Sequence, residues 1–222
     1  MLIVNLYEAI TYNHFIISGF LVCILYFLYY TIKTPQKLYN LLTVLLTLNF
    51  LTFNLYLLST STFNYKIHLP LHLCYLTELS ILVSIIFKSQ IFYPWLALNA
   101  LGGGITGFTN SNLLEDSMLI EHIHLYLSHF NLLLFSIIVY LNKLVISKSN
   151  LIKSSIFNAS IFFGVIYFNF FFGSNYWFTS HRPSGSNLTN FLPDWPYYLL
   201  VLISIGLISY YVTFKLFLKN RQ

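Results

Sequence analysis

The chain has 222 residues, of which 57% are hydrophobic, 19% are aromatic and only 8% are charged. This composition excludes a water-soluble globular domain and is typical of an integral membrane protein. The formal net charge of +5 comes from basic residues scattered along the chain, with no basic patch of the kind that binds nucleic acid. We therefore expect an all-α, polytopic transmembrane helix bundle with no nucleic-acid partner.

Seven apolar segments are each long enough, at roughly 20 residues, to form a membrane-spanning helix. In chain order they are residues 14-32, 39-59, 69-87, 91-108, 122-141, 155-173 and 197-217. The first is predicted to be a retained anchor, because no Lys or Arg precedes it. The fourth contains the Gly-rich run "ALNALGGGITGFTN", which leaves open both a continuous helix and a broken or re-entrant one. The seven helices are expected to form a single transmembrane domain, residues 1-222.

The charged residues separate between the two ends of these predicted helices. If successive loops alternate sides, one side holds nine of the 11 basic residues, namely Lys33, Lys37, Lys88, Lys143, Lys148, Lys153, Lys215, Lys219 and Arg221. The other side holds Lys66 and Arg182 together with five of the six acidic residues, Glu8, Glu115, Asp116, Glu121 and Asp194. Because cytoplasmic loops carry an excess of Lys and Arg, we predict an N-terminus outside and a C-terminus in the cytoplasm.

The third segment begins with "HLPLHLCYLTELS", residues 68 to 80, which sets potentially reactive side chains in an apolar sequence. Cys74, Thr77 and Glu78 have the i, i+3, i+4 spacing that places them on one face of a helix. A carboxyl group within a membrane segment is expected to face the bundle interior or a cavity, because exposure to lipid is costly. A packing role is the alternative for Cys74.

The fifth segment presents a matching polar stripe of His122, Tyr126, His129 and Ser136. Both segments are predicted to enter the membrane from outside, which puts His129 at a depth similar to that of Cys74. A thiol needs a neighbouring base to become a nucleophile.

We therefore predict that Cys74 is a nucleophile, that His129 is its base and that Glu78 orients the imidazole, as the third member of a triad does. A hydrogen-bonded structural role is the alternative for His129. His72, His122 and Tyr126 are candidate substrate-binding residues at the same end of the bundle.

Several motifs occur together in this order: "LPLHLC" at 69–74, the Gly-rich fourth segment, "LSHFNLLLF" around His129, "FGSNYWF" and "LPDWPYYLL". In these motifs, from about residue 65 to 215, the chain resembles the YwaF-like family of bacterial integral membrane proteins, which is related to transmembrane protein 164 of animals. The resemblance implies a lipid acyltransferase with Cys74 as nucleophile and His129 as base. It also implies a phospholipid acyl donor, a lysolipid acceptor and a place in the bacterial cell membrane. The orientation predicted from the charges puts the active site toward the outer side.

Other residues are candidates for holding the substrate. His181 and Arg182 lie in an outer loop, where a guanidinium group suits a lipid phosphate; an interfacial anchor is the alternative. Freed backbone N–H groups at Gly103 and its neighbours would suit the oxyanion of acyl transfer if the fourth segment is broken. Close helix packing is the alternative for these glycines.

Two other functions remain open from the sequence. A zinc-dependent lipid hydrolase would use His68, His72 and Cys74 with His122 or His124, although Pro70 interrupts the spacing of the first two. A transporter or ligand-binding protein would use Glu78, the histidines and the membrane asparagines as a polar path. The acyltransferase hypothesis needs no cofactor or metal, and the oligomeric state stays open.

Overall fold

The computed structural model describes residues 13–32, 34–114, 116–183 and 187–219, which form helices joined by loops. Seven α-helices account for most of these residues: α2 (His14–Thr31), α3 (Pro35–Ser59), α4 (Leu73–Ile86), α5 (Tyr93–Thr109), α6 (Leu119–Leu141), α7 (Lys148–Phe172) and α8 (Tyr197–Lys219). Two short 3-10 helices, η1 (Tyr176–Phe178) and η2 (Leu188–Phe191), lie between α7 and α8. Each of the seven predicted segments therefore contains one helix.

Five of the helices, α2, α3, α6, α7 and α8, are long and apolar enough to cross a membrane. The third predicted segment is shorter than expected, because α4 starts at Leu73, after Pro70 and the extended residue His72. Its 14 residues span about 21 Å, less than the roughly 30 Å hydrocarbon core of a bilayer. The length and apolar character of the five longer helices make the chain a membrane protein.

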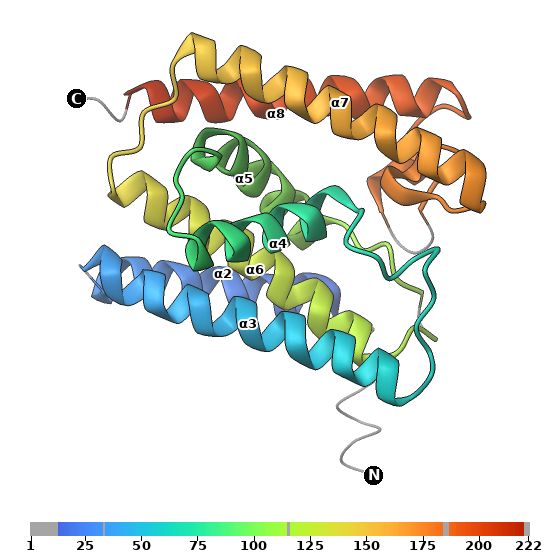
Figure 1. Ribbon diagram of the computed structural model, residues 1–222, viewed down its shortest axis with the longest axis horizontal. Helices are drawn as coiled ribbons and strands as arrows, with labels where there is room; N and C mark the ends of the chain where they lie inside the picture. Colours follow the sequence, from blue (N-terminus) through green and yellow to red (C-terminus); the bar gives the residue numbers. More distant parts are fainter. Residues whose placement is uncertain (1–12, 33, 115, 184–186, 220–222) are drawn as a thin grey trace.

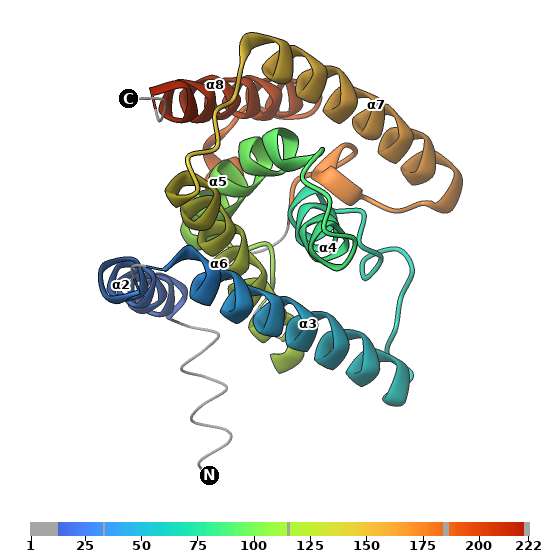
Figure 2. The ribbon, with the colours of Figure 1, turned by 60° about the vertical axis from the view of Figure 1, so that its left-hand side comes forward.

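Helix α6 lies at the centre of the bundle and contacts α2, α3, α4 and α5 (Figures 1 and 2). Most of its side chains are buried, whereas the side chains of α2, α7 and α8 are mostly exposed. Helix α5 packs along α6 and also contacts α4, α7 and α8. Residues on α5 and α6 are therefore the ones that the fold encloses, while the outer helices present apolar surface that suits lipid.

The Gly-rich fourth segment forms a continuous helix, α5, through Gly102, Gly103 and Gly104. A Cβ atom at Gly102 would lie 2.1 Å from Ser209 Oγ of α8, and one at Gly104 would lie 2.5 Å from Leu133 Cγ of α6. The absence of side chains thus allows α5 to approach two neighbouring helices closely, as small residues do in membrane bundles. Because the helix is unbroken, the amides of these glycines lie inside a helix and not at a freed helix end.

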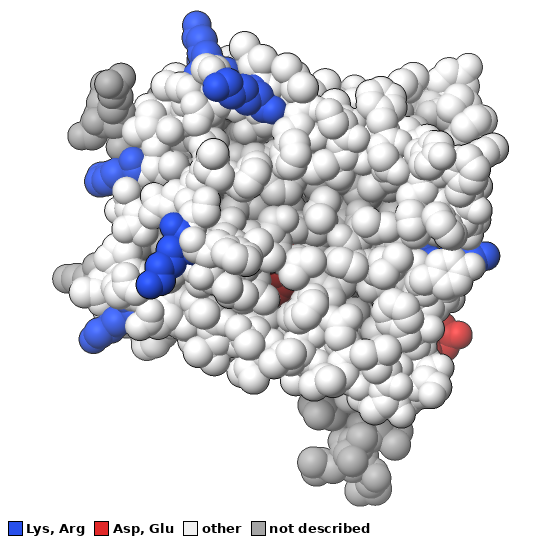
Figure 3. Space-filling model, in the orientation of Figure 1, with Lys and Arg blue, Asp and Glu red and all other residues white. Residues whose placement is uncertain are grey.

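The charged residues gather at the two ends of the bundle (Figure 3). Lys37 and Lys148 lie in the first turns of α3 and α7, and Lys88 and Lys143 follow the ends of α4 and α6; Figure 1 shows these four helix ends on one side of the molecule. Glu8, Lys33, Glu115 and Arg221, which also enter the charge argument, lie outside the described residues. This separation fits the loop alternation predicted from the sequence, and the assignment of the Lys-rich end to the cytoplasm stays a prediction.

Candidate functional site

Cys74 occupies the first turn of α4 and faces the glycines of α5. Its Sγ lies 3.2 Å from the position that a Cβ on Gly103 would take. The side chain is partly buried against the main hydrophobic core. Gly103 was expected to offer a backbone donor to substrate, and in the structure it lies against the sulfur atom.

His129 is buried on α6, and its ring fits against Gly107 of α5. A Cβ at Gly107 would lie 1.9 Å from His129 Cδ2 and 2.1 Å from Nε2. His129 Nδ1 lies 2.6 Å from the carbonyl oxygen of Leu125, which can only accept a hydrogen bond. In the neutral imidazole Nδ1 therefore carries the hydrogen, and Nε2 has the free lone pair that a base requires.

Cys74 and His129 thus contact consecutive turns of the same helix. Gly103 and Gly107 are four residues apart, which places their contact points about 6 Å from each other along α5. No hydrogen bond joins Cys74 Sγ to His129 within the described structure. The two side chains pack against neighbouring turns of α5 and are not hydrogen-bonded to each other. A proton can pass between them only after one side chain shifts toward the other.

Glu78 lies one turn below Cys74 on α4 and is almost fully buried. Its Oε1 accepts hydrogen bonds from Asn49 Nδ2 at 2.9 Å and Asn131 Nδ2 at 2.8 Å, and its Oε2 accepts one from Ser128 Oγ at 2.6 Å. The predicted triad would have Glu78 orient His129, but these three bonds go to other partners. The carboxyl group instead connects α3, α4 and α6.

The cluster extends from Glu78 to His124, a half-buried residue of α6. His124 Nδ1 lies 3.3 Å from Asn49 Oδ1, and its ring stacks on Phe53 with 3.9 Å between centroids. We call Asn49, Glu78, His124, Ser128 and Asn131 the Glu78 cluster.

Ser128 and Asn131 were not predicted as site residues from the sequence. A signal was present, because His124, Ser128 and Asn131 have the i, i+4, i+7 spacing of one helical face. Their partners, Glu78 of α4 for Ser128 and Asn131 and Asn49 of α3 for His124, could not be inferred, since spacing within one helix does not reveal which neighbour it faces.

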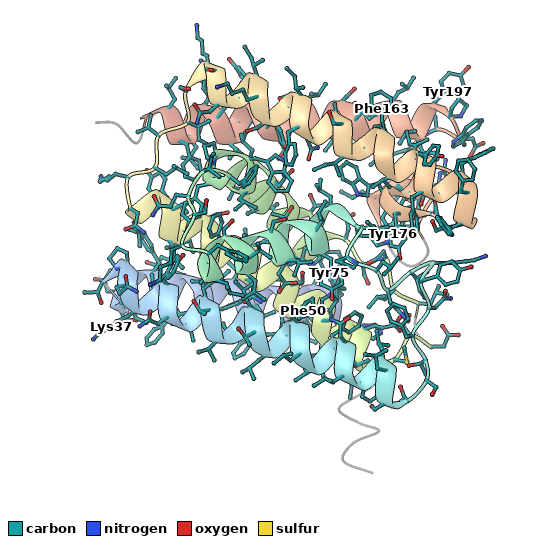
Figure 4. The ribbon with its side chains drawn as sticks, viewed as in Figure 1. Lys37, Phe50, Tyr75, Phe163, Tyr176 and Tyr197 are labelled. Carbon is teal, nitrogen blue, oxygen red and sulfur yellow. The ribbon has the colours of Figure 1, made fainter. Side chains whose placement is uncertain are left out.

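The crevice beside the Glu78 cluster is narrow. Phe50 and Tyr75 line it together with Glu78, and their rings lie 6.4 Å apart between α3 and α4 (Figure 4). Asn54 Nδ2 donates to the hydroxyl of Tyr75 at 2.7 Å. The crevice has no space for a water-sized molecule, so the cluster is closed in this structure.

His122 and Tyr126, two further predicted site residues, lie on α6 above His129. His14 of α2 packs against them: its Nδ1 lies 3.2 Å from Tyr126 Oη, and the two rings stack 5.4 Å apart. The Nε2 atoms of His14 and His122 are buried and have no hydrogen-bond partner among the described residues. His14 was not predicted from the sequence, since a single histidine at a helix start carries no pattern.

His72 is held outside the start of α4 by aromatic residues of the loop between α7 and α8. The centroid of its ring lies 4.9 Å from that of Tyr176 and 5.1 Å from that of Phe178. The Trp177 amide donates to its Nδ1 at 3.4 Å. Burial lowers the pKa of His72 to about 4, so the imidazole is neutral at physiological pH. Figure 4 shows Tyr176 at this end of the bundle.

Arg182 does not approach Cys74 or His129 in the described structure. Its Nη2 donates to the carbonyl oxygen of Leu192 at 2.6 Å and to Asp194 Oδ1 at 3.0 Å. Its guanidinium carbon lies 5.9 Å from the ring centroid of Tyr198. The neighbouring His181 is exposed. These contacts tie the loop to the start of α8.

The residues proposed for a zinc site are not brought together. His68 accepts a hydrogen bond from the Asn64 amide at Nδ1, and its Nε2 lies 3.2 Å from Glu121 Oε1. Over the described ranges no group of three or more His, Cys, Asp or Glu side chains is placed to hold a metal ion. The geometry therefore gives the zinc hydrolase hypothesis no support.

Comparison with known proteins supports one assignment. A model of the TMEM164 family matches residues 9–214, which include every helix described here up to the last turns of α8. Comparison with curated proteins and with solved structures gives no significant match. Since the matched residues cover most of the chain, this membrane protein belongs to the TMEM164 family.

Proposed function

We propose that the protein is a membrane-bound lipid acyltransferase in which Cys74 is the nucleophile and His129 is its base. The observation that carries this proposal is the packing of both side chains on the glycine face of α5, at Gly103 and Gly107, with His129 Nε2 free to take a proton. Membership of the TMEM164 family agrees with it, because the sequence resemblance to that family implies the same two residues.

The proposed reaction has two steps. In the first, Cys74 Sγ attacks the ester carbonyl of a phospholipid, and His129 Nε2 takes the thiol proton and returns it to the departing lysolipid hydroxyl. In the second, the hydroxyl of a lysolipid acceptor attacks the thioester, and His129 takes its proton and returns it to the sulfur. Water as the acceptor would give hydrolysis. Neither step needs a cofactor.

Glu78 acts in this proposal as a positioning residue. Cys74 lies one helical turn from Glu78 on α4, and His129 is adjacent to Ser128 on α6. The hydrogen bonds of Glu78 to Ser128 and Asn131 therefore fix the relative height of the two helices that carry the reacting groups.

The proposed site faces the outer leaflet of a bacterial cell membrane. Cys74 lies in the first turn of α4, whose other end leads to Lys88, and His129 lies near the middle of α6, whose last turn leads to Lys143. With the positive-inside orientation the start of α4 is outside.

Mass spectrometry of the purified protein in mixed phospholipid and lysophospholipid micelles tests the proposal. We expect acyl transfer and an acyl mass on Cys74, and we expect both to vanish in Cys74→Ala. His129→Ala is expected to abolish transfer and the adduct. Cys23→Ala is the matched control, because this second cysteine lies exposed on α2, and it should retain full activity.

Absence of turnover and of a thioester across a broad lipid panel would refute the acyltransferase. The second candidate would then be a binding or transport protein that uses the Glu78 cluster. The buried Asn131 Oδ1, which has no hydrogen-bond partner in the part of the chain that the structure describes, favours this candidate because it leaves an acceptor for a ligand or proton. Such a protein should tolerate Cys74→Ser and lose function in Glu78→Gln.

A further inference from the structure

A cavity of about 560 Å³ lies between α4, α5 and α7, away from the residues described above. Figure 2 shows α4 and α7 facing each other across this space, with α5 beside both. Its lining is almost entirely apolar, and α4 and α7 contribute most of it, with Leu76, Leu79, Val83, Ile161, Gly164 and Phe168 among the residues. We call it the α4–α7 slot.

The slot is long and follows the helices. Its lining on α7 runs from Phe157 to Phe168, at the i, i+4, i+7 spacing of one helical face. Eleven steps of 1.5 Å give a length of about 16 Å. This is close to half of the roughly 30 Å hydrocarbon core of a bilayer, which is the depth of one leaflet.

The slot is continuous with surface that suits lipid. Gly164 is exposed at its edge, and a Cβ added there would meet no atom within 4 Å. Phe163, the residue before Gly164 on α7, is 68% exposed (Figure 4). A molecule in the bilayer can therefore reach the slot sideways, between α4 and α7.

We propose that the α4–α7 slot binds one acyl chain of a bilayer phospholipid. An apolar cavity of this size is costly when empty, because its lining loses dispersion contacts, and its apolar walls do not hold water. An extended hydrocarbon chain matches its shape, length and chemistry, and the surrounding bilayer supplies such chains.

The bound chain is not the chain presented to Cys74. Leu76, Leu79 and Val83 point into the slot, and at 100° per residue they lie on the face of α4 opposite Cys74. The helix itself separates the slot from the thiol. This inference therefore stands apart from the proposed acyl transfer and can hold if that proposal fails.

Quenching of tryptophan fluorescence by phospholipids brominated along their acyl chains tests the slot in nanodiscs. Trp95 of α5 lines the slot, and its share of the signal is the difference between the wild-type protein and Trp95→Phe. We expect this share to be strongly quenched in the wild-type protein. Gly164→Leu should at least halve the quenching, because the leucine side chain takes up space that the chain needs.

Gly206→Leu is the matched control. Gly206 is also an exposed helical glycine around which an added Cβ meets nothing within 4 Å, and it does not line the slot. We expect the quenching of Trp95 to be unchanged in this variant. Val83→Phe fills the slot from the α4 side and replaces Gly164→Leu if the latter fails to fold.

Native mass spectrometry gives a second readout. The wild-type protein, Gly206→Leu and Cys74→Ala are expected to retain one phospholipid that the slot-filling variants lose. Retention in Cys74→Ala separates this site from the catalytic proposal. Unquenched Trp95 in the wild-type protein, or equal quenching and equal lipid retention in folded Gly164→Leu or Val83→Phe, would overturn the inference.

Discussion

The ring of His129 lies so close to Gly107 that a Cβ at residue 107 would be 1.9 Å from His129 Cδ2. Gly107→Ala should therefore displace the imidazole or separate α5 from α6. Alanine favours a helix by about 1 kcal/mol over glycine, whereas overpacking costs about 1–3 kcal/mol. We expect a lower thermal midpoint in detergent and loss of any acyl adduct on Cys74.

Gly19→Ala is the control for that substitution, because an added Cβ at Gly19 meets nothing within 4 Å. Its midpoint should equal or slightly exceed that of the wild-type protein. A Gly107→Ala variant as stable and as active as Gly19→Ala would contradict the packing described here.

Glu78→Leu tests the carboxyl group that connects three helices. A leucine side chain accepts no hydrogen bond, so Asn49 Nδ2, Asn131 Nδ2 and Ser128 Oγ would lose their acceptor inside the bundle. The expected loss is about 1–3 kcal/mol in the free energy of unfolding, measured by denaturant titration in mixed micelles. Ser160→Ala, which removes an exposed hydrogen bond to Ile156, should change little. Equal stability of the two variants would argue against a structural role for Glu78.

The neutral state of His72 makes stability depend on pH. The pKa of His72 is lowered by burial from 6.5 to about 4, so between these pH values the unfolded chain binds more protons than the folded one. Stability should therefore fall as pH falls from 6.5 toward 4. Thermal midpoints across this range should decline less in His72→Gln, which keeps an acceptor for the Trp177 amide. Parallel pH profiles would show that other groups govern the decline.

Arg182 is expected to stabilise its loop and not to bind the substrate phosphate. Removing its bond to the Leu192 carbonyl in Arg182→Ala should cost about 1 kcal/mol, with the exposed pair to Asp194 adding little. In the proposed acyl transfer, KM for phospholipid should stay unchanged. A KM that rises several-fold at unchanged stability would instead assign the guanidinium group to phosphate binding.

The helices were predictable because a long apolar segment favours a helix: each of the seven segments contains a helix, and five of these helices are long and apolar enough to cross a membrane. The predicted and observed helix ends differ. Helix α4, for example, begins four residues later than predicted because Pro70 and the extended residue His72 precede it. Whether the Gly-rich segment was continuous could not be predicted, since glycine permits both a break and close packing. In the structure Gly102 packs against α8 and Gly104 packs against α6, so these glycines serve close helix packing.

The residue types of the candidate site were predictable from the sequence. Which of these side chains contact one another was less predictable. Spacing placed Cys74 with Glu78 on one face of α4, and both face the interior as expected. Spacing could not fix the rotation of α6 relative to α4. That rotation turns Ser128 and Asn131 toward Glu78 and turns His129 toward α5.

The hydrogen bonds that Glu78 receives also bear on how the bundle assembles. Alone in a bilayer, α4 would be a 14-residue helix with an unsatisfied carboxyl group, too short and too polar to remain inserted. Its acceptors are satisfied only by Asn49 of α3 and by Ser128 and Asn131 of α6. Since α3 and α6 are long and apolar enough to cross a membrane, we expect α4 to enter the membrane as a dependent helix, after α6 has been synthesised and placed beside α3.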